Sequence, residues 1–180
     1  MFKYFKGKDY PGRGIIIGLS DCGNDAVIAY FIMGRSENSR NRKFEPENEN
    51  DLIIRPVDES KVSDPSLIIY RSVVDLGKTI VVTNGDQTDT IVDHLNEGGN
   101  FETALKTRGY EPDEPNFTPR ISGILNMPEG KPFTYKLSIL RKHSKDDDGC
   151  DRLFYEYEAK AGKAHLIHTY RGEAEGTPTT

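Results

Sequence analysis

Four basic residues fall within nine positions of the sequence: Arg35, Arg40, Arg42 and Lys43. They directly follow an apolar run that ends at Gly34, so their side chains start from the end of a rigid strand and can reach into a cleft. A planar guanidinium group binds phosphate oxygens two at a time, which an ammonium group does less well. The cluster therefore predicts a binding site for a small anion, and a solvated basic loop is the alternative.

A second polar stretch covers residues 83–90, where a strand end, a tight turn and a helix start follow one another. Exposed backbone N–H groups at a helix start suit an anion or a nucleobase carbonyl. Asn84, Asp86 and Gln87 are therefore candidate binding residues. The alternative is purely structural, because Asn-Gly is ordinary turn chemistry and Asp86 is a suitable helix cap.

The third stretch is the loop of residues 110–121, which three prolines stiffen. A rigid loop can hold catalytic groups in place, and this one carries Glu111, Asn116 and Arg120. A plain solvated connection explains the loop equally well. Tyr70, in the middle of the apolar segment 66–74, has the pattern of a core tyrosine whose hydroxyl is satisfied.

The elements that must position these groups follow from hydrophobic periodicity and turn residues. Apolar positions at helical spacing predict helices over 86–96 and 101–108, and 35–51 is expected to be a long functional loop. Strands are expected at residues 14–20, 26–34, 66–74, 79–83, 120–127, 133–140, 152–158 and 164–170. About eight strands, with a helical pair between the fourth and fifth, predict an α+β fold with dominant antiparallel sheet and helices on one face.

Length and charge limit the function classes. A chain of 180 residues has enough surface to bury for one core, so we expect a single domain over 1–180. The net charge of −5 argues against extended contact with nucleic acid. The longest apolar stretch is too short to cross a bilayer and no signal segment is evident, which predicts a cytoplasmic protein without a membrane partner. Cys22 and Cys150 are expected to be free thiols.

Several familiar motifs do not meet their structural requirements. His165 and His168 are three residues apart in an expected strand, so they face opposite sides and cannot share a metal ion. The segment 77–79 resembles the end of a phosphate-binding loop, but a strand follows where a helix is required. The sequence also has no Gly-x-Ser-x-Gly elbow, which disfavours a serine hydrolase. We therefore expect no metal site.

Six short blocks together resemble the archaeal-type IMP cyclohydrolase family. They are YPGRGIIIG (10–18), GRSENSRNR (34–42), IIYRSV around Tyr70, TNGDQTDT (83–90), Tyr110-Glu111 with the segment 116–121, and HTYRG (168–172). The blocks come in the family's order and span nearly the whole chain. Each is short, so their joint occurrence carries the resemblance.

This resemblance implies an αββα sandwich similar to that of N-terminal-nucleophile hydrolases. Self-processing is not implied, because the chain begins Met1-Phe2 and supplies no nucleophilic residue there. The implied activity closes 5-formamidoimidazole-4-carboxamide ribotide to inosine monophosphate with loss of water. It needs a purine ribonucleotide as partner and no cofactor, and it is compatible with a homo-oligomer. A non-catalytic purine-nucleotide-binding module and an amide hydrolase on the same fold are the alternatives.

The resemblance also assigns roles by motif position. Arg35, Tyr70 and Glu111 are the expected catalytic residues, with Tyr70 as proton donor and Glu111 as its acidic partner. One of the three clustered arginines is expected to polarise the formyl or carboxamide oxygen and another to bind the 5′-phosphate. The expected substrate-binding residues are Arg40, Arg42, Asn84, Asp86, Gln87, Asn116 and Arg120.

Overall fold

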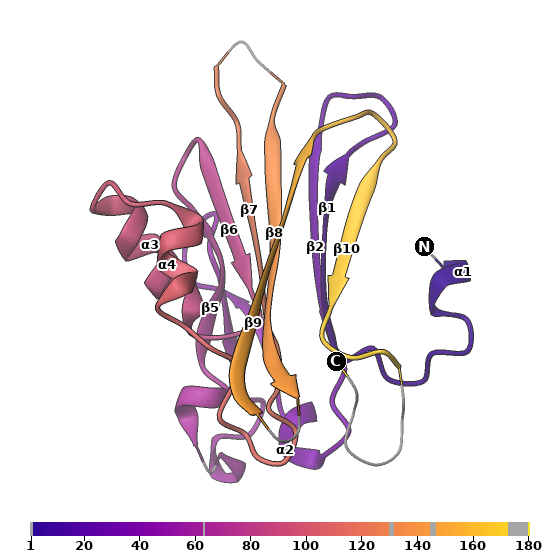
Figure 1. Ribbon diagram of the computed structural model, residues 1–180, viewed down its shortest axis with the longest axis vertical. Coiled ribbons are helices and arrows are strands. Elements are labelled where there is room, and N and C mark those ends of the chain that lie inside the picture. Colours follow the sequence, from indigo (N-terminus) through magenta and orange to yellow (C-terminus); the bar gives the residue numbers. More distant parts are fainter. Residues whose placement is uncertain (1, 63, 130–131, 145–146, 173–179) are drawn as a thin grey trace.

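The structure, a computed structural model, describes residues 2–62, 64–129, 132–144, 147–172 and 180 (Figure 1). In this part of the chain, ten strands form two antiparallel sheets. The smaller has the order β10-β1-β2, and the larger has the order β3-β4-β5-β6-β7-β8-β9. The strands are β1 (Arg13–Leu19), β2 (Ala26–Ile32), β3 (Lys43–Pro46), β4 (Leu52–Arg55), β5 (Tyr70–Asp75), β6 (Thr79–Thr83), β7 (Arg120–Asn126), β8 (Thr134–Ser144), β9 (Asp147–Glu158) and β10 (Ala164–His168).

The two sheets pack face to face through the alternating apolar residues of their strands. In β1, Ile15 and Ile17 are fully buried, and the strand pairs with β2 on one side and β10 on the other. Their side chains meet residues of β6, β7 and β8, among them Val82, Ile121 and Leu137. Because side chains alternate between the two faces of a strand, every second residue of these strands faces the space between the sheets.

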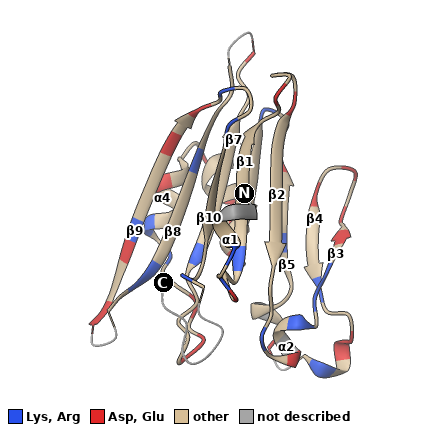
Figure 2. Cartoon of the chain, turned by 90° about the vertical axis from the view of Figure 1, so that its right-hand side faces the viewer, with Lys and Arg blue, Asp and Glu red and all other residues tan. Residues whose placement is uncertain are grey.

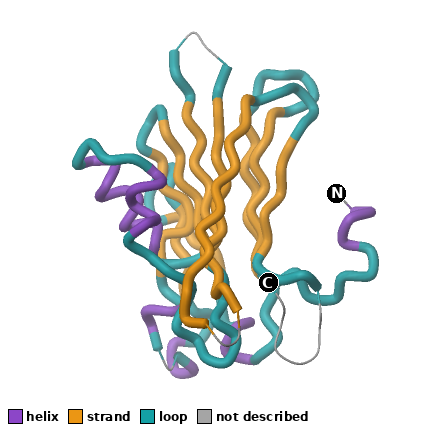
Figure 3. Tube along the Cα trace, in the orientation of Figure 1, coloured by secondary structure: helices purple, strands orange, loops and turns teal. Residues whose placement is uncertain are grey.

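Helices α3 (Gln87–Asn96) and α4 (Phe101–Lys106) cover the outer face of the larger sheet (Figure 3). Ile91 and Leu105 are fully buried there against strand residues such as Val81. A capping box begins α4, in which the Asn100 side chain accepts a hydrogen bond from the backbone of Thr103. The predicted helical pair is confirmed, and in the sequence it follows β6 and precedes β7.

The outer face of the smaller sheet is covered differently. Among the described residues, the helix beside it is the four-residue α1 (Phe2–Phe5), whose Phe5 packs edge-on against Phe31 and His168. The α+β class with dominant antiparallel sheet is therefore confirmed. No helix in the described ranges has the length and apolarity needed to span a membrane.

The segment between β2 and β5 departs from expectation. The predicted loop 35–51 contains α2 (Glu37–Arg40) and β3, and β3 pairs with the unpredicted β4 at the edge of the larger sheet (Figure 2). Both strands have four residues, too short for a clear alternation of apolar and polar positions. The predicted strand 66–74 begins only at Tyr70, because 3₁₀ helix η2 (Pro65–Leu67) precedes it and η1 (Glu59–Lys61) lies before that.

The last predicted strands are all present with shifted ends. Strand β9 begins at Asp147, five residues before the predicted start at Arg152, because it pairs with β8 almost to the end of that strand. The sequence Lys145 to Gly149 also predicts a turn; residues 145 and 146 lie outside the described part of the chain, and residues 147–149 belong to β9 instead. Cys22 and Cys150 are free thiols, as expected.

Candidate active site between the two sheets

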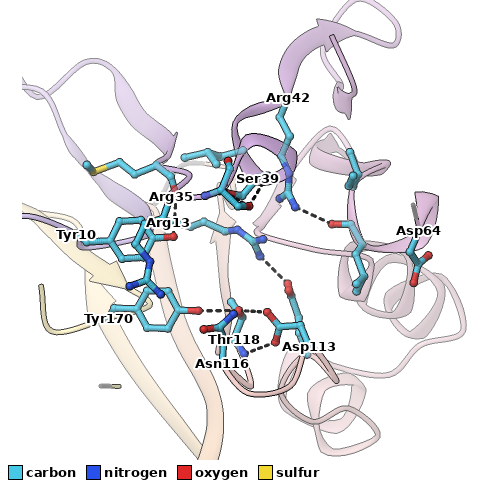
Figure 4. A pocket seen from close by; sticks show the side chains of 16 residues that line it. Tyr10, Arg13, Arg35, Ser39, Arg42, Asp64, Asp113, Asn116, Thr118 and Tyr170 are labelled. Atoms are coloured by element: carbon cyan, nitrogen blue, oxygen red, sulfur yellow. Dashed lines mark hydrogen bonds and ion pairs between the residues drawn. The ribbon is translucent and has the colours of Figure 1, made fainter. Parts of the chain in front are cut away.

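A cavity of about 320 Å³ opens at one end of the sandwich (Figure 4). Five parts of the chain line it: residues 10–13, 32–42, 64–68, 111–118 and Tyr170. It therefore lies where β1 begins, β2 ends and the loop between α4 and β7 returns to the sheet. Of the residues predicted to form a site, Arg35, Arg42, Glu111 and Asn116 are among those that line it.

An ion pair between Arg13 and Glu111 lies at the inner end of the cavity. Arg13 Nη1 lies 2.7 Å from Glu111 Oε1 and also donates to the backbone oxygen of Asn84 at 3.3 Å. The two side chains are 11% and 4% exposed. Burial raises the pKa of Glu111, opposed by the charges of Arg13 and Arg120. Burial acts to lower the pKa of Arg13, but Glu111 and two nearby phenols outweigh it and the pKa is raised.

The two phenols belong to Tyr30 on β2 and Tyr70 on β5, whose hydroxyl oxygens lie 2.8 Å apart. Tyr70 is only 4% exposed. Burial raises the pKa of Tyr70, and the charges of Arg13 and Arg42 act against this increase. Tyr70 is thus a buried tyrosine, but its hydroxyl faces arginines and a second phenol and is not surrounded by hydrocarbon. We call Arg13, Tyr30, Arg42, Tyr70 and Glu111 the arginine–tyrosine cluster.

Arg42 is the most unusual member of this cluster. Its Nη2 donates to the backbone oxygen of Leu67 at 3.2 Å, whereas Nε and Nη1 are buried and have no hydrogen-bond partner among the residues that the structure describes. Burial, followed by the charge of Arg13, lowers the Arg42 pKa. A buried cation with unsatisfied donors is costly unless something binds to it. Arg42 is therefore suited to bind an anion or a carbonyl oxygen.

The other two clustered arginines have different environments. The Arg35 guanidinium lies over the ring of Tyr10, 4.7 Å from its centroid, and Tyr10 stacks on Tyr170 at 5.5 Å. Arg40 is not among the residues that line the cavity, and its Nη1 donates to the backbone oxygen of Arg35 at 2.7 Å. Arg40 thus holds the turn that carries Arg35.

The polar residues 84–87 lie behind the cavity, packed against the start of β7. The Asn84 side chain donates to the Pro119 oxygen and accepts from the Ile121 N–H and from Gln87. Gln87 in turn accepts from Arg120 Nη1 at 2.9 Å. Asp86 forms ion pairs with Arg108 and Arg120, and these arginines keep its pKa low although burial acts to raise it. The structure brings these residues together, but none of Asn84, Asp86, Gln87 and Arg120 lines the cavity.

The loop that carries Glu111 is braced by its own polar groups. The Glu111 N–H donates to the Thr118 oxygen at 2.8 Å, and Asp113 accepts from the backbone and side chain of Thr118. The Thr118 hydroxyl also contacts the Tyr170 hydroxyl at 2.7 Å (Figure 4). Burial raises the pKa of Tyr170 to about 12, so this phenol stays neutral near physiological pH. The expectation of a rigid loop holding Glu111 agrees with these bonds.

Sequence reasoning missed the cavity residues Tyr10 and Arg13 and the cluster residue Tyr30. Tyr10 and Arg13 belong to the block YPGRGIIIG, which supported the resemblance without being assigned a role. The usable signal was the lone arginine at the start of an otherwise apolar strand. Tyr30 gave no such signal, because a tyrosine inside the apolar run of β2 looks like any other core residue.

The histidines lie as expected. His165 Nδ1 lies 2.6 Å from the Tyr135 hydroxyl between the sheets, whereas His168 contacts α1 on the outer face. In the part of the chain that the structure describes, no group of three or more His, Cys, Asp and Glu side chains is placed to hold a metal ion.

Comparisons with known proteins agree with the resemblance. The family model described as "IMP cyclohydrolase-like protein" matches residues 10–179. A protein from Methanococcus maripaludis (strain S2) named IMP cyclohydrolase is 34% identical over 165 residues, which cover 89% of this chain and 74% of that one. Proteins of the same name from Methanothrix thermoacetophila and Methanocaldococcus jannaschii are 32% and 34% identical over 122 residues, and each match spans 58% of the relative's length. This chain belongs to the IMP cyclohydrolase-like family.

Proposed function

We propose that this protein is an IMP cyclohydrolase that closes 5-formamidoimidazole-4-carboxamide ribotide to inosine monophosphate in the cavity between the sheets. Family membership supports the reaction. The single structural observation that supports its location is the buried Arg42 guanidinium, two of whose nitrogens have no partner in the described part of the chain, in a cluster with Tyr70, Arg13 and Glu111. We further propose that the fold is the αββα sandwich of N-terminal-nucleophile hydrolases and that the protein acts in the cytoplasm.

The reaction needs positioning first. A carboxamide nitrogen is a poor nucleophile and a formamide carbon is a poor electrophile, so the two must be held in attack geometry. Orientation of this kind can supply up to roughly 7–11 kcal/mol of the barrier. In this proposal, Arg35 binds the 5′-phosphate at the cavity mouth together with the hydroxyls of Ser36 and Ser39, which line the cavity. Asn116, on the braced loop, binds the base or ribose.

The arginine–tyrosine cluster stabilises the charge that develops on the substrate and transfers the protons. As the carboxamide nitrogen attacks the formyl carbon, negative charge develops on the formyl oxygen, and the unpartnered N–H groups of Arg42 stabilise it. The carboxamide and the formamide nitrogens each lose one proton, and these two protons leave with the formyl oxygen as water. Glu111 accepts the proton from each nitrogen in turn, and Tyr70 delivers each of the two protons to the formyl oxygen, first to the oxyanion and then to the hydroxyl group that departs as water.

The environment of Glu111 makes it suitable for accepting protons from the substrate nitrogens. Burial raises the pKa of its carboxyl group, which makes it a better proton acceptor near neutral pH than an exposed glutamate. Arg13 fixes one carboxylate oxygen by its 2.7 Å contact. The loop that carries Glu111 is supported by residues that do not line the cavity, namely Asn84, Asp86, Gln87 and Arg120, which bind the chain on either side of the loop. Arg40 holds the turn that carries Arg35.

The test is turnover by the purified protein. We expect the formamido ribotide to be converted to inosine monophosphate, followed by the ultraviolet change as the second ring forms. Tyr70→Phe should lower kcat by roughly 10²–10⁴-fold if the phenol donates a proton. A binding module would bind inosine monophosphate without turnover. An amide hydrolase would release formate and the amino ribotide, which chromatography distinguishes from the closed ring. Either outcome would reject the proposal.

A further inference from the structure

The hydroxyl pair of Tyr30 and Tyr70 joins the two sheets beside Arg13 and Arg42, which line the cavity, although neither tyrosine is itself among the lining residues. Tyr30 comes from β2 of the smaller sheet and Tyr70 is the first residue of β5 in the larger sheet. Their oxygens lie 2.8 Å apart. No other hydrogen bond of the Tyr70 hydroxyl is present among the described residues, so Tyr30 is the protein group that orients it.

The ring of Tyr30 is itself held in place. The residue lies opposite Ile15 in the β1–β2 ladder, and its ring packs on the core between the sheets. On another side the ring meets Phe44 of β3 edge-on, with centroids 5.6 Å apart and planes at 88°. A side chain fixed at its backbone, its ring and its hydroxyl can hold a neighbouring phenol accurately.

We infer that Tyr30 is a positioning residue for ring closure, which donates a hydrogen bond to the Tyr70 oxygen and thereby leaves the Tyr70 proton directed at the substrate. This inference rests on the proposed function. A phenol has one proton to give and lone pairs to accept with. If Tyr30 donates, Tyr70 accepts, and the only proton on Tyr70 is free for the departing oxygen.

The same bond stabilises what Tyr70 becomes. When Tyr70 gives its proton to the departing oxygen, its own oxygen becomes a phenolate, and the Tyr30 O–H then donates to a charged acceptor, which is a stronger hydrogen bond. Arg13 and Arg42 both act electrostatically on this oxygen. Glu111 takes one proton from the carboxamide nitrogen and later one from the formamide nitrogen, and each of them restores the Tyr70 phenol. Tyr70 thus protonates the formyl oxygen twice, the oxygen leaves as water, and the cycle closes without any other proton source.

The test is Tyr30→Phe, with Tyr135→Phe as the matched control. Tyr135 is also a buried tyrosine of the core whose hydroxyl bonds across the sheets, to His165 at 2.6 Å, but it lies outside the arginine–tyrosine cluster. We expect Tyr30→Phe to lower kcat at least about tenfold with KM within about twofold, and Tyr135→Phe to keep wild-type kinetics. 4-Aminophenylalanine at position 30 keeps a donor of similar reach and should restore most of kcat.

A double-mutant cycle separates positioning from a general structural effect. If Tyr30 acts through Tyr70, its substitution should change nothing further in a Tyr70→Phe background. An equal loss in both backgrounds, or equal activity of the phenylalanine and 4-aminophenylalanine proteins, would overturn the inference. Unchanged turnover of Tyr30→Phe beside an active wild-type protein would reject the role of Tyr30 alone. Absence of turnover in the wild-type protein would reject the ring-closing function and this inference with it.

Discussion

Two buried polar regions lie next to each other in this protein, and they differ in how completely they are satisfied. Around Asn84 and Gln87, both fully buried, the side-chain amides have hydrogen-bond partners within the protein. In the arginine–tyrosine cluster, Arg42 keeps two buried nitrogens, Nε and Nη1, without a partner among the described residues. A satisfied network fixes a structure, whereas an unsatisfied cation needs a ligand to complete it.

The ion pairs differ in the same way. Each region has two arginines and one carboxylate, but Asp86, at the partly exposed edge of the first region, pairs with both Arg108 and Arg120. In the cluster, Glu111 pairs with Arg13, and among the described residues no carboxylate forms an ion pair with Arg42. Arg42 is therefore a largely buried positive charge without a direct counter-ion, which a developing oxyanion would balance.

The largest effect is expected from Glu111→Gln, which keeps the shape of the side chain and removes the only carboxylate of the cluster. Arg13 would then be a buried cation without its counter-charge, so the free energy of unfolding should fall by about 3–5 kcal/mol. Turnover should fall by about 10²-fold or more. Urea unfolding and initial rates measure the two effects, with Glu97→Gln, an exposed residue at the end of α3, as control. Wild-type values for both would contradict the assigned role.

Asn84→Ala tests the satisfied region. It removes three hydrogen bonds and leaves the Ile121 N–H and the Pro119 oxygen buried without them, which should cost about 2–4 kcal/mol of unfolding free energy. Asn100→Ala, which removes the cap of α4, should cost only about 1 kcal/mol. Equal losses from the two substitutions, measured by urea unfolding, would show that the network adds nothing beyond a surface cap.

Arg42→Met should behave in the opposite manner to Asn84→Ala. Because it replaces a buried cation that has unsatisfied donors, the free energy of unfolding should stay the same or rise by roughly 1 kcal/mol. The kcat for ring closure should fall at least about tenfold, since the developing oxyanion loses its buried guanidinium. The matched control is Arg55→Met, which replaces an exposed arginine at the end of β4. A loss of stability as large as that of Asn84→Ala would remove the distinction between the regions.

Most of the fold could be predicted from the sequence because its strands are long and apolar. The hairpin of β1 and β2, the helical pair and the four C-terminal strands all carry a clear periodicity. The hairpin of β3 and β4 does not, because four-residue strands such as KFEP and LIIR sit at a sheet edge where charged side chains are tolerated.

The site was less predictable, for a physical reason. Residues such as Arg42 and Glu111 stood out because charged side chains in a strand end or a stiff loop need an explanation. Asn84 and Gln87 have residue types that serve a ligand and a buried network equally well, and only tertiary contacts distinguish the two. Tyr30 and Arg13 come from strands that looked purely structural, and the packing of one sheet on the other brings them to Tyr70 and Glu111.

The smallest effect links the two regions through the pH dependence of turnover. Burial raises the Glu111 pKa above its usual value of 4.5. We therefore expect kcat/KM to fall as the pH drops through that raised pKa, and this fall should begin at a higher pH than it would with an exposed glutamate. Arg120, in the satisfied network, lowers the pKa of Glu111 without touching the cavity. Arg120→Gln should therefore move the acidic limb to higher pH while leaving the plateau rate within a fewfold of wild type. A limb that stays in place would mean that the network acts on Glu111 only through structure, because removing a nearby positive charge must otherwise make the carboxylate easier to protonate.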